Sequence, residues 1–486
     1  MYKENLNQMP ELVRNLILTL KEQFPQCSTN SVTNIALAKI AEVLNWKRVR
    51  FNEFGNTGFS NIFVMIFLPS GYGKDRMVDD MDKHLLPDFF HWFNEEAIKY
   101  KQEIKKKIIQ EAEEKFPEND KVKQSYIKEQ LNKIRDLIPE LHDGTQEGLF
   151  QDAKALKNAG YGGILIKMSE LGLYLSSLTP ERKKLLTQLN DAYSCKIASK
   201  SIKGENRENN IDNLPICALL YSDPTLFKDN IKILFNALME TGLGRRCFIT
   251  FMHKQETYKI ETDFKKAYAQ RKQYFLRLQK LGQKFFLLFS AINKNAVYEQ
   301  TEETFEVLYD YTITLKKSAE LEENSLLCKE IISRELKALK LSTLFACLNH
   351  PTEEFIYPED MKQAISTIEA LSTDLKFFLN YKPKFTDKYD SIYSFFLEHQ
   401  GQEFTKTELI NNYRHVFCLS RDKLRAEFEK LMEVVQEIAM QHNYFIDKKL
   451  INNGSGHTYA LKPIPVGELS EHVIPLDSLL SITENQ

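Results

Sequence analysis

The sequence has few of the features that mark membrane, disulfide-rich or strongly charged proteins. No apolar run reaches the ~18 residues of a membrane span, which argues against a membrane protein. The seven cysteines are scattered without any C-x-x-C pair, so neither a disulfide framework nor a zinc module is indicated. The formal net charge is only −2. Any nucleic acid binding must therefore come from local basic patches rather than from an overall field.

What is present is the composition of a globular chain. Hydrophobic residues make up 43% and charged residues 27% of the 486 residues, a length that allows two to four domains. The first residues, 1–5, include the acidic Glu4 and lead into no apolar segment. We therefore expect neither a signal peptide nor a transit peptide, and a cytoplasmic location.

A buried strand followed by a glycine turn organises the chain. Residues 62–68 are all apolar, as in a strand that is covered on both faces. The next residues include Gly71 and Gly73, which allow successive backbone N–H groups to face one point. A helix that starts there directs the positive end of its dipole to the same point, so a phosphate would bind there and Lys74 would reach its outer oxygens. The predicted nucleotide-binding residues are Ser70, Gly71, Gly73, Lys74, Asp75 and Arg76.

This turn resembles the P-loop of nucleotide hydrolases in the degenerate form SGxGK. The first glycine of the full pattern would fall at Leu68, and the hydroxyl residue after the lysine is replaced by Asp75. That hydroxyl is the usual side-chain ligand of Mg²⁺, so Asp75 becomes the candidate metal ligand at this position. The alternative is a strand-turn-helix connection in which the glycines only cap the helix.

A second apolar strand, residues 164–168, ends at Ser169 and Glu170. In P-loop ATPases this strand ends in an acidic residue that holds Mg²⁺, often beside a glutamate that orients the attacking water. Glu170 is therefore a predicted catalytic residue, and Ser169 stands at the metal position without a carboxylate. The alternative for Glu170 is a first-turn helix residue that the helix dipole favours.

Two basic features accompany the later strands. The polar stretch 196–207 precedes the apolar strand 214–221. Ring-shaped helicases place loops that contact DNA at the position of this stretch. The alternative is that the stretch is an ordinary surface hairpin. Arg246 precedes another apolar strand. From there it could reach the nucleotide of a neighbouring subunit as an arginine finger and act in catalysis. The alternative is that Arg246 forms a structural ion pair. The predicted nucleic-acid-binding residues are Lys196, Lys200, Lys203 and Arg207.

The order of the motifs PSGYGK, DGTQEGL, GGILIKMSEL, YSDP and GLGRRCFITF resembles the RecA-like, DnaB-related P-loop ATPases of phage and plasmid replication modules. The resemblance covers about residues 35–381. It implies a RecA-like core, a hexameric ring, ATP with Mg²⁺ and translocation on single-stranded DNA in a bacterial host cytoplasm. By this resemblance, Lys74, Glu170 and Arg246 are the residues expected to carry the ATPase activity.

The predicted fold class is α/β, with a RecA-like core, helical additions and a winged-helix domain. Residues 51–59 are expected to form a loop, and the dense Lys and Glu of residues 95–138 predict a protruding helical hairpin. Residues 267–281 are basic with interleaved aromatics, which suits either a nucleic acid strand or amphipathic helix packing. The predicted domains are a helical segment 1–50, a core 51–265 with a helical insertion 90–140, a helical bundle 266–381, a winged-helix-like domain 386–463 and a flexible tail 464–486.

The winged-helix expectation is based on three helices followed by two short strands around the turn Asn452–Gly456. Such domains bind DNA through the third helix and the wing, but they also dock proteins. The predicted third helix carries both signs of charge, so both uses stay open, with replication or mobile-element proteins as expected partners.

Two functions of different classes remain. The first is an ATP-dependent DNA helicase or translocase of a phage or mobile-element replication module. The second is a scaffold derived from such an ATPase, which assembles without turnover. Asp75 and Ser169 favour the scaffold because both usual protein contacts to the metal are altered, whereas Gly73, Lys74 and Glu170 favour the enzyme.

Overall fold

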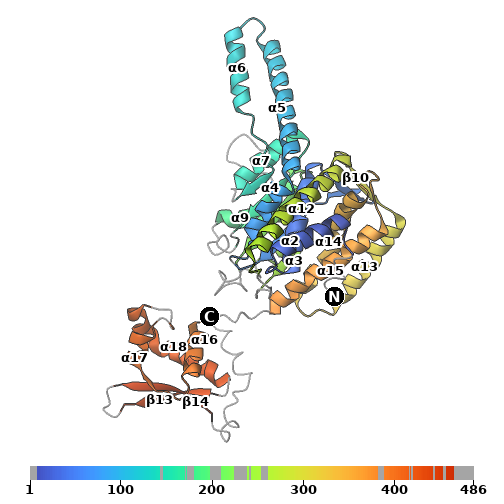
Figure 1. Cartoon of the computed structure of the whole chain (residues 1–486). Coiled ribbons are helices and arrows are strands. Elements are labelled where there is room, and N and C mark those ends of the chain that lie inside the picture. Colours follow the sequence, from blue (N-terminus) through green and yellow to red (C-terminus); the bar gives the residue numbers. More distant parts are fainter. Residues whose placement is uncertain are drawn as a thin grey trace. The chain divides into compact units, whose positions relative to one another are not determined.

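The chain divides into two compact units, residues 1–380 and 381–486, which are treated separately (Figure 1). None of the helices among the described residues is both long and apolar enough to cross a membrane. The computed structural model describes residues 8–69, 71–142, 146–169, 171, 180–197, 210–223, 238–239, 242–252, 261–380, 388–414, 416, 420–441, 444–451 and 456–464.

A five-stranded parallel sheet lies at the centre of the first unit, with the strand order β4-β5-β8-β3-β9. Every residue of β3, β5, β8 and β9 is buried, which explains their unbroken apolar sequences. The predicted strands and the α/β class are confirmed, and the arrangement is compatible with a RecA-like core. The strands are β4 (Glu140–His142), β5 (Ile164–Met168), β8 (Ile216–Ser222), β3 (Phe63–Phe67) and β9 (Cys247–Phe251).

The register of the sheet brings the ends of its strands together. Phe67 at the end of β3 pairs with Ser222 of β8 and with Phe251 of β9, and Met168 of β5 pairs with Leu220 of β8. We call the side on which these strands end the carboxyl edge and the opposite side the amino edge. The residues that follow β3, β5 and β8 therefore all emerge at the carboxyl edge.

Helices from the start of the chain cover the sheet. The predicted N-terminal helices are present as α2 (Glu11–Gln23) and α3 (Thr29–Trp46), and α3 contacts β3, β8 and β9. The Ser28 side chain accepts a hydrogen bond from Ser31 N and so caps α3. The helix that follows β3 is α4 (Lys74–His84), which starts at the glycine turn as the sequence predicts.

A helical hairpin projects from the first unit, as predicted (Figure 1). It consists of α5 (Pro87–Lys115) and α6 (Asp120–Asn132), and α6 has no buried residue. Phe89 and Phe93 at the base of α5 are buried. Strand β4, at the edge of the sheet, follows the hairpin, although no strand is predicted there from the sequence.

The predicted loop at residues 51–59 is wrong, because this segment is a β-hairpin of β1 (Arg50–Glu53) and β2 (Asn56–Phe59). Its turn residues have positive φ, 49° at Phe54 and 89° at Gly55, as a type I′ turn requires. Strand β1 also pairs with β10 (Val297–Gln300), which pairs with β11 (Phe355–Ile356). Strand β10 lies far from β1 in the sequence, so the local sequence does not predict that they pair.

The remaining helices of the first unit pack around the sheet. The helices predicted after residue 264 are present, and they belong to the same compact unit as the sheet. Helix α15 contacts β9, and α12 contacts α2, α4 and α5. These helices are α7 (Gln146–Ala159), α9 (Pro180–Tyr193), α11 (Leu243–Arg246), α12 (Phe264–Ala291), α13 (Glu302–Glu320), α14 (Ser325–Asn349) and α15 (Pro358–Asn380).

The described part of the second unit has three helices and a three-stranded antiparallel sheet of order β12-β14-β13. The predicted helices and strands are all present. Helix α17 starts with a capping box in which Thr405 and Glu408 satisfy each other's backbone N–H groups. The elements are α16 (Lys388–Glu398), β12 (Phe404–Thr405), α17 (Lys406–Asn412), α18 (Arg421–Gln441), β13 (Tyr444–Leu450) and β14 (His457–Pro463).

Candidate functional site

The glycine turn after β3 has the backbone geometry that its sequence predicts. Leu68 N donates to Ser222 O at 2.9 Å, which continues the sheet pairing for one residue beyond β3. Gly71 and Gly73 have φ of 83° and 86°, in the left-handed region that residues with a β-carbon rarely adopt. Gly73 is the N-cap of α4. The turn therefore directs the start of α4 toward the carboxyl edge.

The connection between α2 and α3 supports this turn. Gln26 Nε2 and Cys27 Sγ both donate to Tyr72 O, at 3.0 and 3.2 Å. A β-carbon on Gly73 would lie 3.0 Å from the Phe24 ring, so a larger residue here would have to displace the ring. The turn is thus held from outside as well as by its own glycines.

Lys74, the first residue of α4, is a buried lysine at the carboxyl edge. Its side chain is only 6% exposed, and Nζ lies 5.8 Å from the centroid of the Tyr221 ring on β8. Among the described residues, no carboxylate lies within ion-pairing distance of this ammonium group. A buried charge without a partner is costly, so the position favours an anionic ligand.

The other buried lysines of the described residues differ from Lys74 in this respect. Each has an oxygen partner: a carboxylate, a backbone carbonyl, a side-chain amide or a combination of these. The contrast shows that oxygen atoms of the same chain usually pair with its buried ammonium groups. These lysines are Lys39, Lys47, Lys167, Lys337 and Lys340.

Three further polar groups lie at or next to the end of β8 or the start of α4. Burial raises the pKa of Tyr221, and the Asp75 carboxylate raises it further. Asp223, directly after β8, is 5% exposed. The sequence places the polar residues Ser222 and Asp223 at the end of this strand, where a polar side chain can sense a terminal phosphate, but Asp223 is not among the predicted site residues.

The two predicted metal positions lie at the same edge but follow different strands. Asp75 is exposed in the first turn of α4, and Ser169 is exposed after β5. Strand β8 separates β5 from β3, so these strands are about 10 Å apart. No cluster of three metal-binding side chains occurs among the described residues. The predicted Ser70 and Glu170 lie outside the described residues.

Arg246 lies at the amino edge, opposite Lys74. It immediately precedes β9, whose five residues span about 16 Å. Its Nη1 donates to Asn190 Oδ1 at 3.0 Å, and its guanidinium carbon lies 5.8 Å from the Tyr193 ring centroid. Lys74 and Arg246 of one chain are therefore not brought together, and Arg246 has partners within its own chain.

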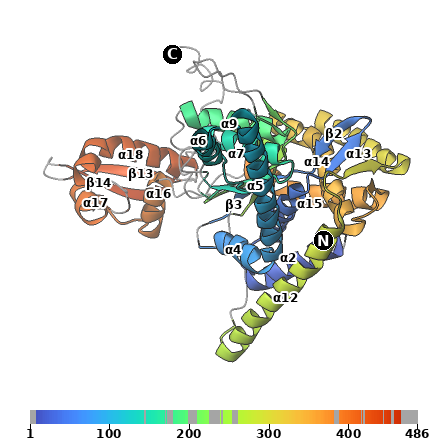
Figure 2. The same ribbon diagram turned by 90° about the horizontal axis from the view of Figure 1, so that it is seen from above.

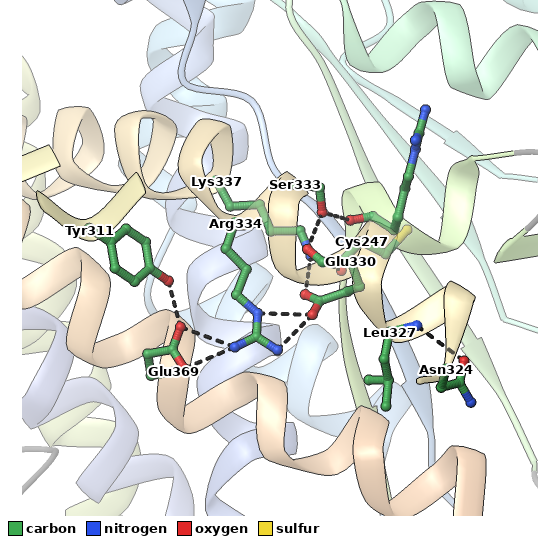
Figure 3. Close-up of polar contacts among 10 residues, drawn as sticks. Cys247, Tyr311, Asn324, Leu327, Glu330, Ser333, Arg334, Lys337 and Glu369 are labelled. Carbon is green, nitrogen blue, oxygen red and sulfur yellow. Dashed lines mark hydrogen bonds and ion pairs between the residues drawn. The ribbon is translucent and has the colours of Figure 1, made fainter. Parts of the chain in front are cut away.

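A polar cluster on α14 and α15 fixes the backbone on both sides of Arg246 (Figure 3). Ser333 Oγ donates to the Arg245 carbonyl at 2.7 Å, and Lys337 Nζ donates to the Cys247 carbonyl at 2.9 Å. Lys337 also pairs with the buried Glu330 at 2.9 Å. The start of β9 is thus rigidly attached to the surrounding helices.

Only one of the predicted nucleic-acid-binding residues can be placed. Lys196 is exposed on β6 (Lys196–Ile197), which pairs with β7 (Ile211–Asp212). Lys200, Lys203 and Arg207 lie outside the described residues.

Neither a family model nor a curated protein matches this sequence. Function must therefore be inferred from the carboxyl edge itself, where a glycine turn, a helix start and a buried lysine meet. In an α/β sheet this edge is the usual place for ligands.

Proposed function

We propose that the chain is an ATP-dependent DNA helicase or translocase of a phage or mobile-element replication module, in which Lys74 binds the ATP phosphates. The observation that carries the proposal is the burial of Lys74 without a carboxylate partner among the described residues. A phosphate would supply the missing negative charge and would be approached by the backbone N–H groups of the turn.

The residues present fit the phosphates of a nucleotide. Gly71 and Gly73 have the left-handed φ that a phosphate-binding nest uses, and the first turn of α4 adds the positive end of its dipole. Arg76 is exposed one residue beyond Asp75, where it can offset the charge of that carboxylate. In this arrangement Lys74 binds and orients the outer phosphate.

Magnesium would be held by Asp75, with the phosphates and water completing its shell, because this ion commonly uses only one or two carboxylates. When bound, the ion neutralises charge that develops during phosphoryl transfer. Ser169 is the proposed partner across the carboxyl edge, and Glu170 is proposed to orient the attacking water. Asp223 provides a second carboxylate at this edge.

Arg246 would act on the nucleotide of a neighbouring copy rather than its own, because it lies at the opposite edge of the sheet from Lys74. This assignment requires assembly, and the proposed form is the hexameric ring that the resemblance implies. The second unit is proposed to be a winged-helix domain, supported by its three helices and the strand order β12-β14-β13. It would contact DNA or dock replication proteins.

The second candidate function is a scaffold that binds nucleotide without turnover. It is favoured by Asp75 and Ser169, which replace the usual hydroxyl and carboxylate contacts to the metal. Steady-state ATP hydrolysis, measured with and without single-stranded DNA, separates the two. Turnover that DNA stimulates supports the helicase, whereas nucleotide binding without turnover supports the scaffold.

Replacing Lys74 by Met tests the nucleotide site. Lys74→Met should weaken binding of a fluorescent ATP analogue at least tenfold, about 1.4 kcal/mol, because the ammonium group that reaches the phosphate is lost. It should not lower the stability of the nucleotide-free protein, because a buried charge without a partner is removed. Fluorescence titration and urea unfolding measure the two effects.

The matched control is Lys83→Met in the last turn of the same helix. The Lys83 side chain is 70% exposed, so nucleotide affinity should stay within about twofold of wild type. Unchanged affinity in Lys74→Met, or equal losses in both variants, would contradict the proposed phosphate site.

A further inference from the structure

Helix α12 carries an unusual concentration of positive charge. Among its residues 264–291 are seven Lys and Arg residues and no Asp or Glu, in a chain whose formal net charge is −2. One of them, Arg277, pairs with Glu22 at 2.6 Å. The others have no carboxylate partner within the described part of the chain. The seven are Lys265, Lys266, Arg271, Lys272, Arg277, Lys280 and Lys284.

The N-terminal half of α12 is exposed and carries flat side chains. Phe264 and Tyr268 are 79% and 65% exposed, and their rings stack with centroids 6.4 Å apart and an interplanar angle of 28°. The Arg271 guanidinium carbon lies 5.9 Å from the Phe275 ring centroid. Spacings of four, three and four residues place these groups on one stripe of the helix, about 16 Å long. One end of α12 extends beyond the neighbouring helices (Figure 2).

A groove runs beside this stripe, between α12 and the connection from α2 to α3. It has a volume of about 910 Å³, and Lys266, Arg271 and Arg277 line it on the α12 side. Gln26 lines it on the other side, and the same Gln26 holds the glycine turn through Tyr72 O. The groove therefore extends from the basic helix to the support of the candidate nucleotide site.

We propose that the N-terminal half of α12, residues 264–277, binds a single strand of nucleic acid. The proposal deepens the proposed function, because it names a surface for the strand on which the ATPase would act. Cationic side chains without carboxylate partners neutralise phosphates, and exposed rings accept unstacked bases of any sequence. A duplex offers phosphates but no free base faces, and an acidic protein segment needs the charges but not the exposed rings.

Contacts connect this surface to the glycine turn. Tyr274 on α12 donates from its hydroxyl group to Asp80 Oδ2 of α4 at 3.1 Å. Its ring meets the Phe24 ring edge-on, with centroids 6.4 Å apart, and Phe24 packs against Gly73. A strand on α12 would thus lie one layer of side chains away from the helix that starts at Lys74.

The test uses the full chain and a fluorescein-labelled 20-nucleotide oligothymidine, with binding measured by fluorescence anisotropy over a range of salt concentrations. The double variant Phe264→Ala/Tyr268→Ala should bind the strand at least fivefold more weakly at unchanged salt dependence, because stacking is lost while the charges stay. Lys266→Gln/Lys272→Gln should reduce the slope of log affinity against log salt by about 1.4, or about 0.7 for each phosphate contact. All four side chains are exposed, so the variants should fold.

Matched controls change the same chemistry elsewhere. The charge control is Lys105→Gln/Lys106→Gln on the exposed face of α5, and the ring control is Tyr309→Ala on α13, where Tyr309 is 55% exposed. Both controls should leave strand affinity within about twofold of wild type. The α12 variants should also keep their affinity for the ATP analogue. Lys74→Met without nucleotide should bind the strand as wild type does, so that failure of the nucleotide site and failure of α12 are distinguishable.

Three results would overturn the proposal. In the first, wild type does not bind the oligonucleotide; in the second, wild type and both α12 variants bind it with equal affinity. In the third, duplex DNA binds as tightly as the single strand and the ring substitutions have no effect. The last result would assign the surface to duplex phosphates. If the protein instead binds an acidic peptide and no strand, and this binding requires the charges but not the rings, the surface would be assigned to a protein partner.

Discussion

At the scale of single residues, the first unit handles its buried charges in two ways. Lys74 has no carboxylate partner among the described residues, whereas Glu330 is enclosed by cations of its own chain. Glu330 is 2% exposed and accepts from Lys337 at 2.9 Å and from Arg334 at 2.9 and 2.7 Å. Arg334 also reaches Glu369 on α15, whose carboxylate accepts from the Tyr311 hydroxyl group. This network, drawn in Figure 3, connects α13, α14 and α15.

Glu330→Gln should destabilise the first unit by about 3 kcal/mol at pH 7, because Arg334 and Lys337 then lose a buried counter-charge. Urea unfolding followed by tryptophan fluorescence measures this, since Trp46 and Trp92, the chain's two tryptophans, both lie in the first unit. Glu369→Gln is the control. Its side chain is 46% exposed, and it should cost about 1 kcal/mol or less; equal losses would contradict the role of burial.

The same glutamate gives a dependence on pH. Burial alone would raise the pKa of Glu330, but the Lys337 and Arg334 cations lower it below its ordinary value. Its contribution is therefore fully present above the pKa of an unfolded glutamate, about 4.3, and is lost as the pH falls through the lower folded value. Wild type should thus lose stability on acidification below about pH 4.3 more steeply than Glu330→Gln, which has no group to titrate there.

At the scale of elements, the hairpin α5–α6 and helix α12 are both exposed, but they differ in attachment. The hairpin buries little: α6 contributes no buried residue, and beyond Phe93 only Ala112 of α5 is buried. Its contacts are exposed pairs such as Lys115 with Tyr126 at 3.0 Å. Helix α12, in contrast, is anchored by buried residues from Tyr274 onward.

Replacing residues 105–131 by a short Gly-Ser linker should therefore change the unfolding free energy of the first unit by only about 1 kcal/mol or less, and nucleotide affinity by less than about twofold. The control is Phe89→Ala at the hairpin base. Phe89 is fully buried against Phe285, Phe286 and Phe289, so its loss should cost about 3–5 kcal/mol. A large loss on removing the hairpin would show that it supports the core.

At the scale of the whole molecule, the two units have separate cores. The second unit encloses its own apolar cluster, in which Phe396, Leu409, Phe428 and Leu461 are fully buried. A β-hairpin, β13–β14, closes one side of it. A core of this kind is sufficient for independent folding of a small domain.

Residues 381–486 expressed alone should therefore fold cooperatively, and residues 1–380 alone should keep the nucleotide affinity of the full chain. Thermal unfolding by circular dichroism checks the first expectation, and titration with the ATP analogue checks the second. A fragment 381–486 without a cooperative transition, or a loss of nucleotide affinity in residues 1–380 beyond about twofold, would show that the units depend on each other.

The sequence by itself determined the elements whose signals are local. A strand buried on both faces needs an unbroken apolar run, so β3, β5 and β8 were predictable. Gly71 and Gly73 mark left-handed backbone because no other residue adopts it so readily. Helices α13 to α15 follow from periodicity. These signals predicted the α/β class and the position of the glycine turn, while the phosphate predicted to bind at the turn stays a prediction.

Only the tertiary structure decided which of these residues meet. The β1–β2 hairpin extends a sheet through β10, a partner remote in the sequence, and Arg246 lies at the opposite edge from Lys74 because β3 and β9 run parallel. The burial of Lys74 against Tyr221 and the exposure of Phe264 and Tyr268 depend on side chains packing around them or failing to do so. Burial is a property of neighbours in space, and a residue's own sequence context does not specify them.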